Sequence, residues 1–228
     1  MSGRRTTERD RRRRELGQNF LTDRRLLARI IGDLDVRPAE LVVDLGAGAG
    51  AITRALLDVG AHVWAVEVDP EWVRRLRHRF EIARPTSDVR VIGTDLRNLR
   101  LPRVPYRVVA NPPFGLTTDV LATLLDRPDR GPERADLIVQ KEVARKLSRQ
   151  PPATLRAAAW APWWEFRLGP TVPRDSFRPR PGVDAAVLTI VRRDPPVLPT
   201  HLAPRLGEVL RPVWLDGPRS SPRHGRRG

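Results

Sequence analysis

Apolar residues are arranged along this chain in two alternating patterns. Short continuous apolar runs predict strands at residues 41–46, 62–69, 89–95, 106–111 and 135–140. The segments between them carry apolar residues at helical spacing and predict helices at 51–59, 70–80 and 118–125. Continuous apolar strands are typical of sheets covered on both faces, and strand–helix alternation favours parallel pairing. The pattern therefore predicts an α/β fold, with a mostly parallel sheet and helices on both of its faces.

The same pattern predicts elements before and after this alternation. A helix should begin near Thr22, capped by Thr22 or Asp23, because apolar residues then recur on one face: Leu26, Leu27, Ile30, Ile31 and Leu34. Segments 165–168 and 185–191 are candidates for a late antiparallel pair of strands. Proline becomes frequent after residue 194, and a short helix is expected around residues 202–210.

The two ends of the chain are basic and poor in apolar residues. Residues 1–14 include seven arginines and are expected to form a flexible arm. The folded domain is therefore placed at residues 15–193, and residues 194–228 are expected to form a short helical and disordered basic tail. A role of the arm in solubility and a role in nucleic-acid contact both remain open.

Composition narrows the classes of function. The net charge of +15 predicts attraction to a polyanion, although a GC-rich genome would also favour arginine. The chain has no cysteine, which excludes disulfides and thiolate catalysis, and its four histidines lack metal-ligand spacing, so no metal site is expected. No apolar stretch is long enough to span a membrane and no signal peptide is evident, so we expect a cytoplasmic protein.

A glycine-rich turn and two acidic residues follow the first three strands of the alternation. Gly46, Gly48 and Gly50 lie where a strand turns into a helix, and they allow a close approach of the backbone to a ligand. Glu67 ends the second strand and could accept hydrogen bonds from ribose hydroxyls, while Asp95 ends the third and could accept one from an adenine amine. Because ligands of such sheets lie at the carboxyl ends of the strands, these residues predict a nucleoside-containing cofactor. S-adenosylmethionine fits, and NAD remains open on these residues alone.

The segment Asn111-Pro112-Pro113-Phe114 after the fourth strand favours methyl transfer. The side-chain carbonyl of Asn111 and the main-chain carbonyl of Pro112 can accept the two hydrogens of a nucleobase amine. Phe114 offers a flat face for stacking on the base. A rigid turn with a buried ring is the alternative interpretation of this segment. A target base would have to be flipped out or already unpaired to reach such a site.

These motifs together resemble those of the rRNA adenine N6-methyltransferases. The resemblance covers residues 15–191 and consists of Glu15–Leu21, Asp44–Gly50, Val66–Asp69, Gly93–Asp95, Asn111–Phe114, Gln140–Ala144 and Ser176–Val187. Within that family the chain looks closer to the Erm branch, because it has Asn-Pro-Pro-Phe and a high arginine content. It departs from the family in carrying Phe114 where many members have tyrosine, and in a short C-terminal part.

The resemblance implies a Rossmann-like class I methyltransferase with a seven-stranded, mostly parallel sheet and only a short C-terminal helical remnant. It implies S-adenosylmethionine as cofactor and 23S rRNA as partner, before ribosome assembly is complete, with resistance to macrolides, lincosamides and streptogramin B as the result. A monomer is expected. The cofactor-binding residues it implies are Gln18, Asn19, Leu21, Gly46, Gly48, Glu67, Asp95 and Asn111; the catalytic residues are Asn111, Pro112 and Phe114. A small-subunit rRNA dimethyltransferase and a non-catalytic RNA-binding protein remain as alternatives.

Overall fold

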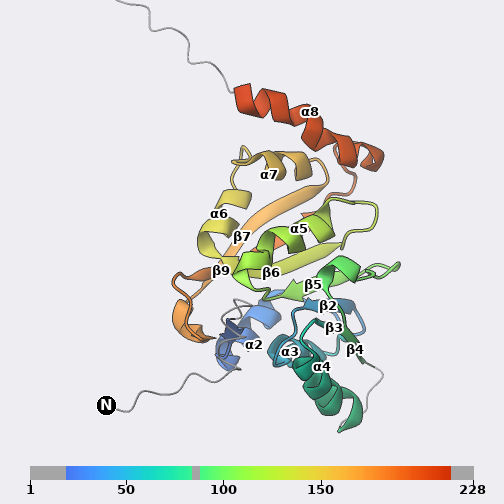
Figure 1. Ribbon diagram of the computed structural model, residues 1–228, viewed down its shortest axis with the longest axis vertical. Helices are drawn as coiled ribbons and strands as arrows, with labels where there is room; N and C mark the ends of the chain where they lie inside the picture. The colour runs from blue at the N-terminus through green and yellow to red at the C-terminus, as the bar shows by residue number, and fades with distance from the viewer. Residues whose placement is uncertain (1–18, 84–87, 217–228) are drawn as a thin grey trace, which may run out of the picture.

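A single seven-stranded sheet forms the centre of the protein (Figure 1). The computed structural model describes residues 19–83 and 88–216, so the predicted arm at 1–14, Gln18 and residues 217–228 lie outside the described part. The strand order is β4-β3-β2-β5-β6-β9-β7. The strands are β2 (Leu41–Leu45), β3 (His62–Glu67), β4 (Val89–Gly93), β5 (Arg107–Ala110), β6 (Arg134–Gln140), β7 (Trp164–Val172) and β9 (Ala185–Arg192).

The pairing of the strands confirms the predicted mixed sheet. Strands β2 to β6 pair in parallel, whereas β9 pairs antiparallel with both β6 and β7. The last strand of the chain therefore enters the sheet between two earlier ones, and the predicted late pair is the β7–β9 pair. Strand order reverses between β2 and β5, and such a reversal opens a crevice at the carboxyl ends of the strands.

Helices cover both faces of the sheet. One core cluster contains residues of α2 (Arg24–Asp33), α3 (Ala51–Asp58) and α4 (Pro70–Leu76), and the other contains residues of α5 (Thr117–Leu125), α6 (Lys141–Leu147) and α7 (Leu155–Trp160). Adjacent strand residues alternate between the clusters, as Val42 and Val43 do. Each fully buried aliphatic side chain contributes about 1.5–3 kcal/mol to folding.

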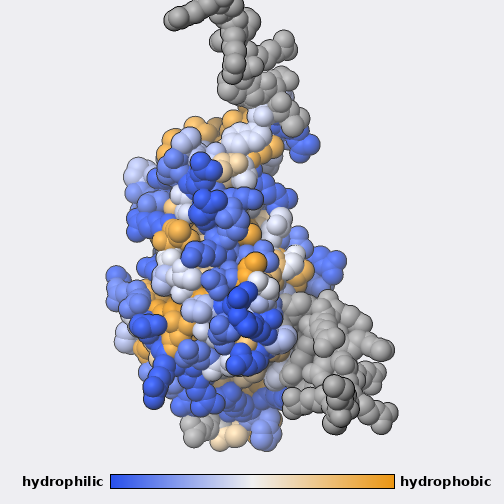
Figure 2. All heavy atoms as spheres, turned by 90° about the vertical axis from the view of Figure 1, so that its left-hand side faces the viewer, coloured by the Kyte–Doolittle hydropathy of each residue, from blue (hydrophilic) through white to orange (hydrophobic). Residues whose placement is uncertain are grey.

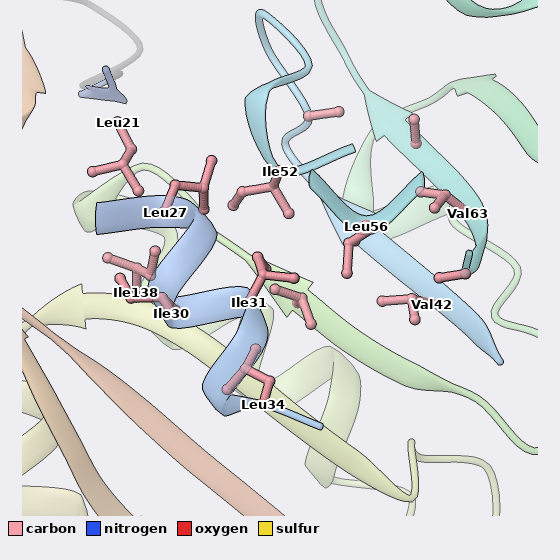
Figure 3. Packing of buried hydrophobic residues seen from close by; sticks show 14 of the residues in the cluster. Leu21, Leu27, Ile30, Ile31, Leu34, Val42, Ile52, Leu56, Val63 and Ile138 are labelled. Carbon is pink, nitrogen blue, oxygen red and sulfur yellow. The ribbon is translucent and has the colours of Figure 1, made fainter. Parts of the chain in front are cut away.

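Helix α2 confirms the predicted apolar face. Leu27 and Ile31 lie toward Ile52 and Leu56 of α3, whereas Ile30 lies beside Ile138 of β6 (Figure 3). Asp23 is the N-cap and accepts a hydrogen bond from the Leu26 N–H at 3.0 Å. Thr22 instead donates its hydroxyl to the Ser176 carbonyl at 3.1 Å. Of the two predicted caps, the structure therefore selects Asp23.

Buried Arg107 attaches the other end of α2 to the sheet. Its guanidinium donates to the carbonyls of Leu34 at 2.8 Å and Asp35 at 3.0 Å, and lies 3.3 Å from the buried carboxylate of Asp136. Arginine donors are well suited to the carbonyls that a helix leaves unsatisfied at its C-terminus.

Replacing Arg107 with methionine should lower the free energy of unfolding by about 3 kcal/mol, because buried acceptors and part of a buried carboxylate lose their partner. Arg134 and Thr189 still satisfy Asp136, which keeps the loss moderate. Urea unfolding of the variant measures the change. The matched control is Arg54→Met, which removes an exposed ion pair with Asp58 and should change stability by less than about 1 kcal/mol.

Two helices differ from their predicted bounds, and two further helices were not predicted. The helix expected over 70–80 ends at Leu76 and continues as a π-helical turn, η1 (Arg77–Ile82). This turn carries the Phe80 ring against Gly50. The late helix α8 (Ala203–Asp216) is longer than expected and follows a 3-10 turn, η5 (Thr200–Leu202). Helices α6 and α7 had no counterpart in the predicted pattern, because each spans only about two turns.

Hydrophilic residues cover most of the face shown in Figure 2, and apolar side chains also show at its upper end, where α8 lies. None of the α8 residues whose exposure is described is buried, and α8 packs chiefly against α7. No helix among residues 19–83 and 88–216 is long and apolar enough to cross a membrane.

Candidate functional site

A cavity of about 350 Å³ lies at the carboxyl ends of β2, β3 and β5 and next to the end of β4. Its size falls in the range of small-molecule sites. Seven of the predicted site residues line it: Asn19, Leu21, Gly46, Glu67, Asp95, Asn111 and Pro112. The sequence places these residues on five separate segments, and the crevice beside the switch point brings them together.

The glycine turn after β2 adopts a backbone that other residues rarely reach. Gly46, Gly48 and Gly50 have φ values of +77°, +50° and +77°. A Cβ atom at Gly48 would lie 2.6 Å from Cε1 of Phe20, and one at Gly50 would lie 2.7 Å from Cε2 of Phe80. The turn therefore requires glycine for its conformation and for close packing, in keeping with a backbone that forms one wall of the cavity.

Glu67 at the end of β3 is held in place by backbone donors. Its carboxylate accepts from the N–H groups of Gly48 at 2.8 Å, Val68 at 2.8 Å and Asp69 at 2.9 Å. The residue is only 2% exposed. A carboxylate has about four acceptor positions, so these bonds fix its orientation and leave capacity for a ligand hydroxyl. The bond to Gly48 also couples Glu67 to the glycine turn.

Asp44 is a site residue that the predicted set lacks. It is 1% exposed and lines the cavity, and its Oδ2 accepts from the Thr53 hydroxyl at 2.7 Å. Its Oδ1 is buried without a hydrogen-bond partner in the described part of the chain. Burial raises the pKa of Asp44 to about 7, against the opposing effect of the Thr53 hydrogen bond. A charged residue inside the apolar run 41–45 was the sequence signal for this position.

Asp95 follows β4 and is paired with Arg97. Its Oδ1 accepts from the Arg97 backbone N–H at 2.9 Å and from Nε at 3.0 Å, and its Oδ2 accepts from Nη2 at 3.0 Å. These hydrogen bonds lower the pKa of Asp95 to about 2. Both residues line the cavity. Asp95, the candidate acceptor for the adenine amine, is therefore negatively charged at neutral pH and lies beside the positive charge of Arg97.

The amide of Asn111 is oriented by a contact from another segment. Its Nδ2 donates to the backbone carbonyl of Asn19 at 2.7 Å. Its Oδ1 is buried, and no residue that the structure describes donates a hydrogen bond to it. A buried acceptor without a donor is unfavourable in the free protein and is satisfied when a ligand brings a donor. The structure thus presents the same acceptor that the sequence analysis assigned to a target amine.

Phe114 and Gly48 lie beside the cavity rather than in its lining. The Phe114 ring is half-buried and meets the Phe177 ring edge-on, with centroids 6.3 Å apart and planes at 71°. This contact agrees with the alternative interpretation of the segment as a turn with a packed ring. The role of Phe114 in stacking on a base stays a prediction.

Among the described residues, no cluster of three or more histidine and acidic side chains could hold a metal ion.

Two distant motifs form one wall of the site. Strand β1 (Phe20–Leu21) pairs antiparallel with β8 (Phe177–Arg178), and the Thr22 N–H donates to the Ser176 carbonyl at 2.8 Å. The opening motif and the late motif of the sequence therefore meet in a two-stranded sheet. Phe20 and Leu21 extend from it into the cavity lining.

Comparison with known proteins gives a consistent set of similarities. A family model described as Ribosomal RNA adenine dimethylase matches residues 9–214. The mycinamicin-resistance protein MyrB of Micromonospora griseorubida is 40% identical over 202 residues, which is 89% of this chain and 63% of that protein. An rRNA adenine N-6-methyltransferase of Corynebacterium diphtheriae is 38% identical over 187 residues, covering 82% and 71% of the two chains.

The fold has counterparts among solved structures. The crystal structure of 23S rRNA methyltransferase ErmE matches with a TM-score of 0.76 at 28% identity, covering 88% of this chain and 81% of that one. A dimethyladenosine transferase from Plasmodium falciparum matches with a TM-score of 0.66 at 20% identity, which supports the fold alone. The chain spans less than two thirds of the length of MyrB, since the match covers 63% of it.

Proposed function

Because the chain belongs to the ribosomal RNA adenine dimethylase family, we propose that it transfers a methyl group from S-adenosylmethionine to the N6 amine of one adenine in 23S rRNA. The observation that carries this proposal is the buried Oδ1 of Asn111, held toward the cavity by Asn19 and lacking a donor within the described residues. The family membership confirms the resemblance drawn from the motifs.

The polar groups that line the cavity fit S-adenosylmethionine. Asp44 offers a buried carboxylate oxygen without a partner inside the described structure, which suits the positively charged methionine end. Glu67 would accept hydrogen bonds from the ribose, and Asp95 would accept one from the adenine amine. Asn19, Leu21 and the glycine turn would contact the rest of the cofactor. When bound, this cofactor supplies an electrophilic methyl group on sulfur.

The residues of the Asn111 segment would prepare the target amine. An adenine amine is a weak nucleophile because its lone pair is delocalised into the ring. Hydrogen bonds to the Asn111 Oδ1 and the Pro112 carbonyl would draw the nitrogen toward a tetrahedral shape and orient its lone pair. No general base is required before transfer, because the nitrogen proton becomes acidic afterwards. Phe114 would stack on the base either after its ring moves away from Phe177 or through the part of its ring that Phe177 leaves exposed.

The large-subunit target is favoured over the small-subunit one. MyrB is named for mycinamicin resistance, and ErmE is named a 23S rRNA methyltransferase. Resistance to macrolides, lincosamides and streptogramin B would follow if methylation obstructs drug docking. Such an enzyme would act in the cytoplasm, as a monomer, on rRNA before ribosome assembly is complete, and the arginine-rich arm would contribute to RNA contact.

The titration of Asp44 predicts a pH-dependent affinity for the cofactor. Its pKa of about 7 means that its carboxylate loses its charge as the pH falls through neutrality. A cationic ligand prefers the ionised form, so affinity for S-adenosylmethionine should fall about tenfold between pH 8 and pH 6. Calorimetric titration at the two pH values measures this change. Asp44→Asn should bind more weakly and show little pH dependence, whereas a wild-type affinity that is constant over this range would contradict the assignment.

Methyl transfer itself is tested with labelled S-adenosylmethionine and protein-free rRNA from both subunits. We expect label at a single adenine of 23S rRNA. Label on small-subunit RNA alone would favour the small-subunit dimethyltransferase. RNA binding without cofactor binding or label would identify a non-catalytic RNA-binding protein and refute the proposal.

A further inference from the structure

Asp95 and Arg97 form a pair at the edge of the cavity that the shared motifs do not explain. Two bonds from the Arg97 side chain and one from its backbone converge on the carboxylate of Asp95, at 2.9–3.0 Å. The side chain of Arg97 is 85% exposed and that of Asp95 is 34% exposed. Exposed ion pairs contribute little to stability. Arg145 with Glu142 and Arg167 with Glu165 form similar bidentate pairs, but none of those four residues lines the cavity, so the Asp95–Arg97 pair is distinguished by its place in the lining.

The pair also does not serve to ionise Asp95. An aspartate is already ionised at neutral pH without a cationic neighbour. The specific effect of Arg97 is geometric. Both acceptor positions of Oδ1 are filled, by the backbone N–H and by Nε, and one position of Oδ2 is filled by Nη2. Within the described chain this leaves Asp95 a single acceptor position, on Oδ2, in a side chain that cannot rotate without breaking a bidentate contact.

Arg97 lies on the turn that directly follows Asp95. Its backbone belongs to the 3-10 turn η2 (Leu96–Asn98), which Asp95 itself caps. The hydrogen bonds and charge of Asp95 raise the pKa of Arg97, and the charge of Asp119 of α5 adds a smaller effect in the same direction. Asp95, Arg97 and Asp119 all line the cavity, so they border the space that the proposed cofactor would fill.

We propose that Arg97 is a positioning residue that sets the nucleobase specificity of the cofactor site by fixing the one acceptor position of Asp95 that remains for the adenine amine. This inference rests on the proposed function. An adenine presents a donor at its amine, whereas hypoxanthine presents a carbonyl oxygen at the same place, which a fixed carboxylate oxygen repels. A carboxylate free to rotate would reorient and discriminate less between the two bases.

The test compares two cofactor products whose bases differ in the C6 substituent and, with it, in the proton on the neighbouring ring nitrogen N1. S-adenosylhomocysteine and S-inosylhomocysteine are titrated calorimetrically into the full chain and into the variants Arg97→Ala, Arg97→Lys and Arg100→Ala. We expect the wild-type protein to prefer the adenosyl compound by about 10- to 100-fold, as for a hydrogen bond to a charged group. Arg97→Ala should reduce this preference about fivefold, because a carboxylate that can rotate binds the adenosyl compound more weakly and repels the inosyl compound less.

The other variants separate positioning from simple charge. Arg97→Lys keeps the charge but not the bidentate contact, so it should restore only part of the preference. Arg100→Ala removes a nearby exposed arginine and should leave the preference at its wild-type value. An unchanged preference in Arg97→Ala, or equal weakening of both ligands, overturns the role of Arg97. Failure of the wild-type protein to bind either compound overturns the proposed function as well, so the two failures are distinguishable.

Discussion

Replacing Asn111 with alanine is expected to lower the rate of methyl transfer by about a thousandfold. The substitution removes the buried Oδ1, and loss of one preorganised polar group that acts in the transition state costs about 10²–10³ in rate. It also removes the bond from Nδ2 to the Asn19 carbonyl, so the wall formed by the opening motif loses a fixed contact. RNA binding should stay within about twofold of wild type, because the charges that contact phosphates are untouched.

Single-turnover methylation with saturating cofactor and RNA measures this rate, and filter binding measures the affinity for RNA. Asn98→Ala provides the matched control, since Asn98 is an exposed asparagine of the turn after β4. The control should retain the wild-type rate. Undiminished methyl transfer by the Asn111 variant would show that the target amine is oriented elsewhere.

The second large effect is expected at Gly48. Alanine there would place its Cβ 2.6 Å from Cε1 of Phe20, on a backbone with φ of +50°. The left-handed backbone costs about 1–2 kcal/mol for a residue with a Cβ, and the ring of Phe20 must also move from its contact with Trp72. The Gly48 N–H donates a hydrogen bond to Glu67, and Phe20 lines the cavity, so the substitution disturbs two parts of the site. Affinity for S-adenosylmethionine should therefore fall at least about tenfold.

Calorimetric titration and urea unfolding, measured side by side, separate lost binding from lost stability. Gly32→Ala is the control, because the added Cβ would meet no atom within 4 Å apart from the neighbouring backbone of helix α2 itself. It should stabilise the protein by about 0.5–1 kcal/mol and leave binding unchanged. A double-mutant cycle with Phe20→Leu should show coupling to Gly48→Ala, since the smaller side chain relieves the collision. Wild-type affinity in Gly48→Ala would contradict the close-approach role of this glycine.

The elements that the sequence predicted well are those whose signal is local. Helix α2 repeats apolar residues on one face, and the parallel strands are continuous apolar runs, so both were found nearly at their observed bounds. The π-helical turn η1 was missed because its cause lies elsewhere: Phe80 packs against Gly50, which is thirty residues away. Short α6 and α7 were missed because too few turns repeat for a periodicity to emerge.

The candidate site likewise contains residues with a local sequence signal and contacts that have none. The chemistry of the glycines, the acids and the Asn-Pro-Pro-Phe segment can be inferred one residue at a time. Five predicted site residues from these groups line the cavity: Gly46, Glu67, Asp95, Asn111 and Pro112. The partners that orient them could not be read in this way. Asn111 donates a hydrogen bond to Asn19 across ninety-two positions. Asp44 is recognisable as a partner for a cation only once its burial and its hydrogen bond with Thr53 are known. The folding of Phe114 onto Phe177 is likewise a product of β1–β8 pairing.

The sequence by itself determined the fold class, the family and the chemical types present at the strand ends, because hydrophobic period, backbone freedom and side-chain chemistry are properties of short segments. Only the tertiary structure decided which acceptors lack a donor within the described chain, which carboxylates are held by backbone or by Arg97, and which ring faces the cavity. Those properties depend on distances between residues far apart in sequence and on the exclusion of water around them. They arise when the strands assemble into the sheet and β1 of the opening motif pairs with β8 of the late one.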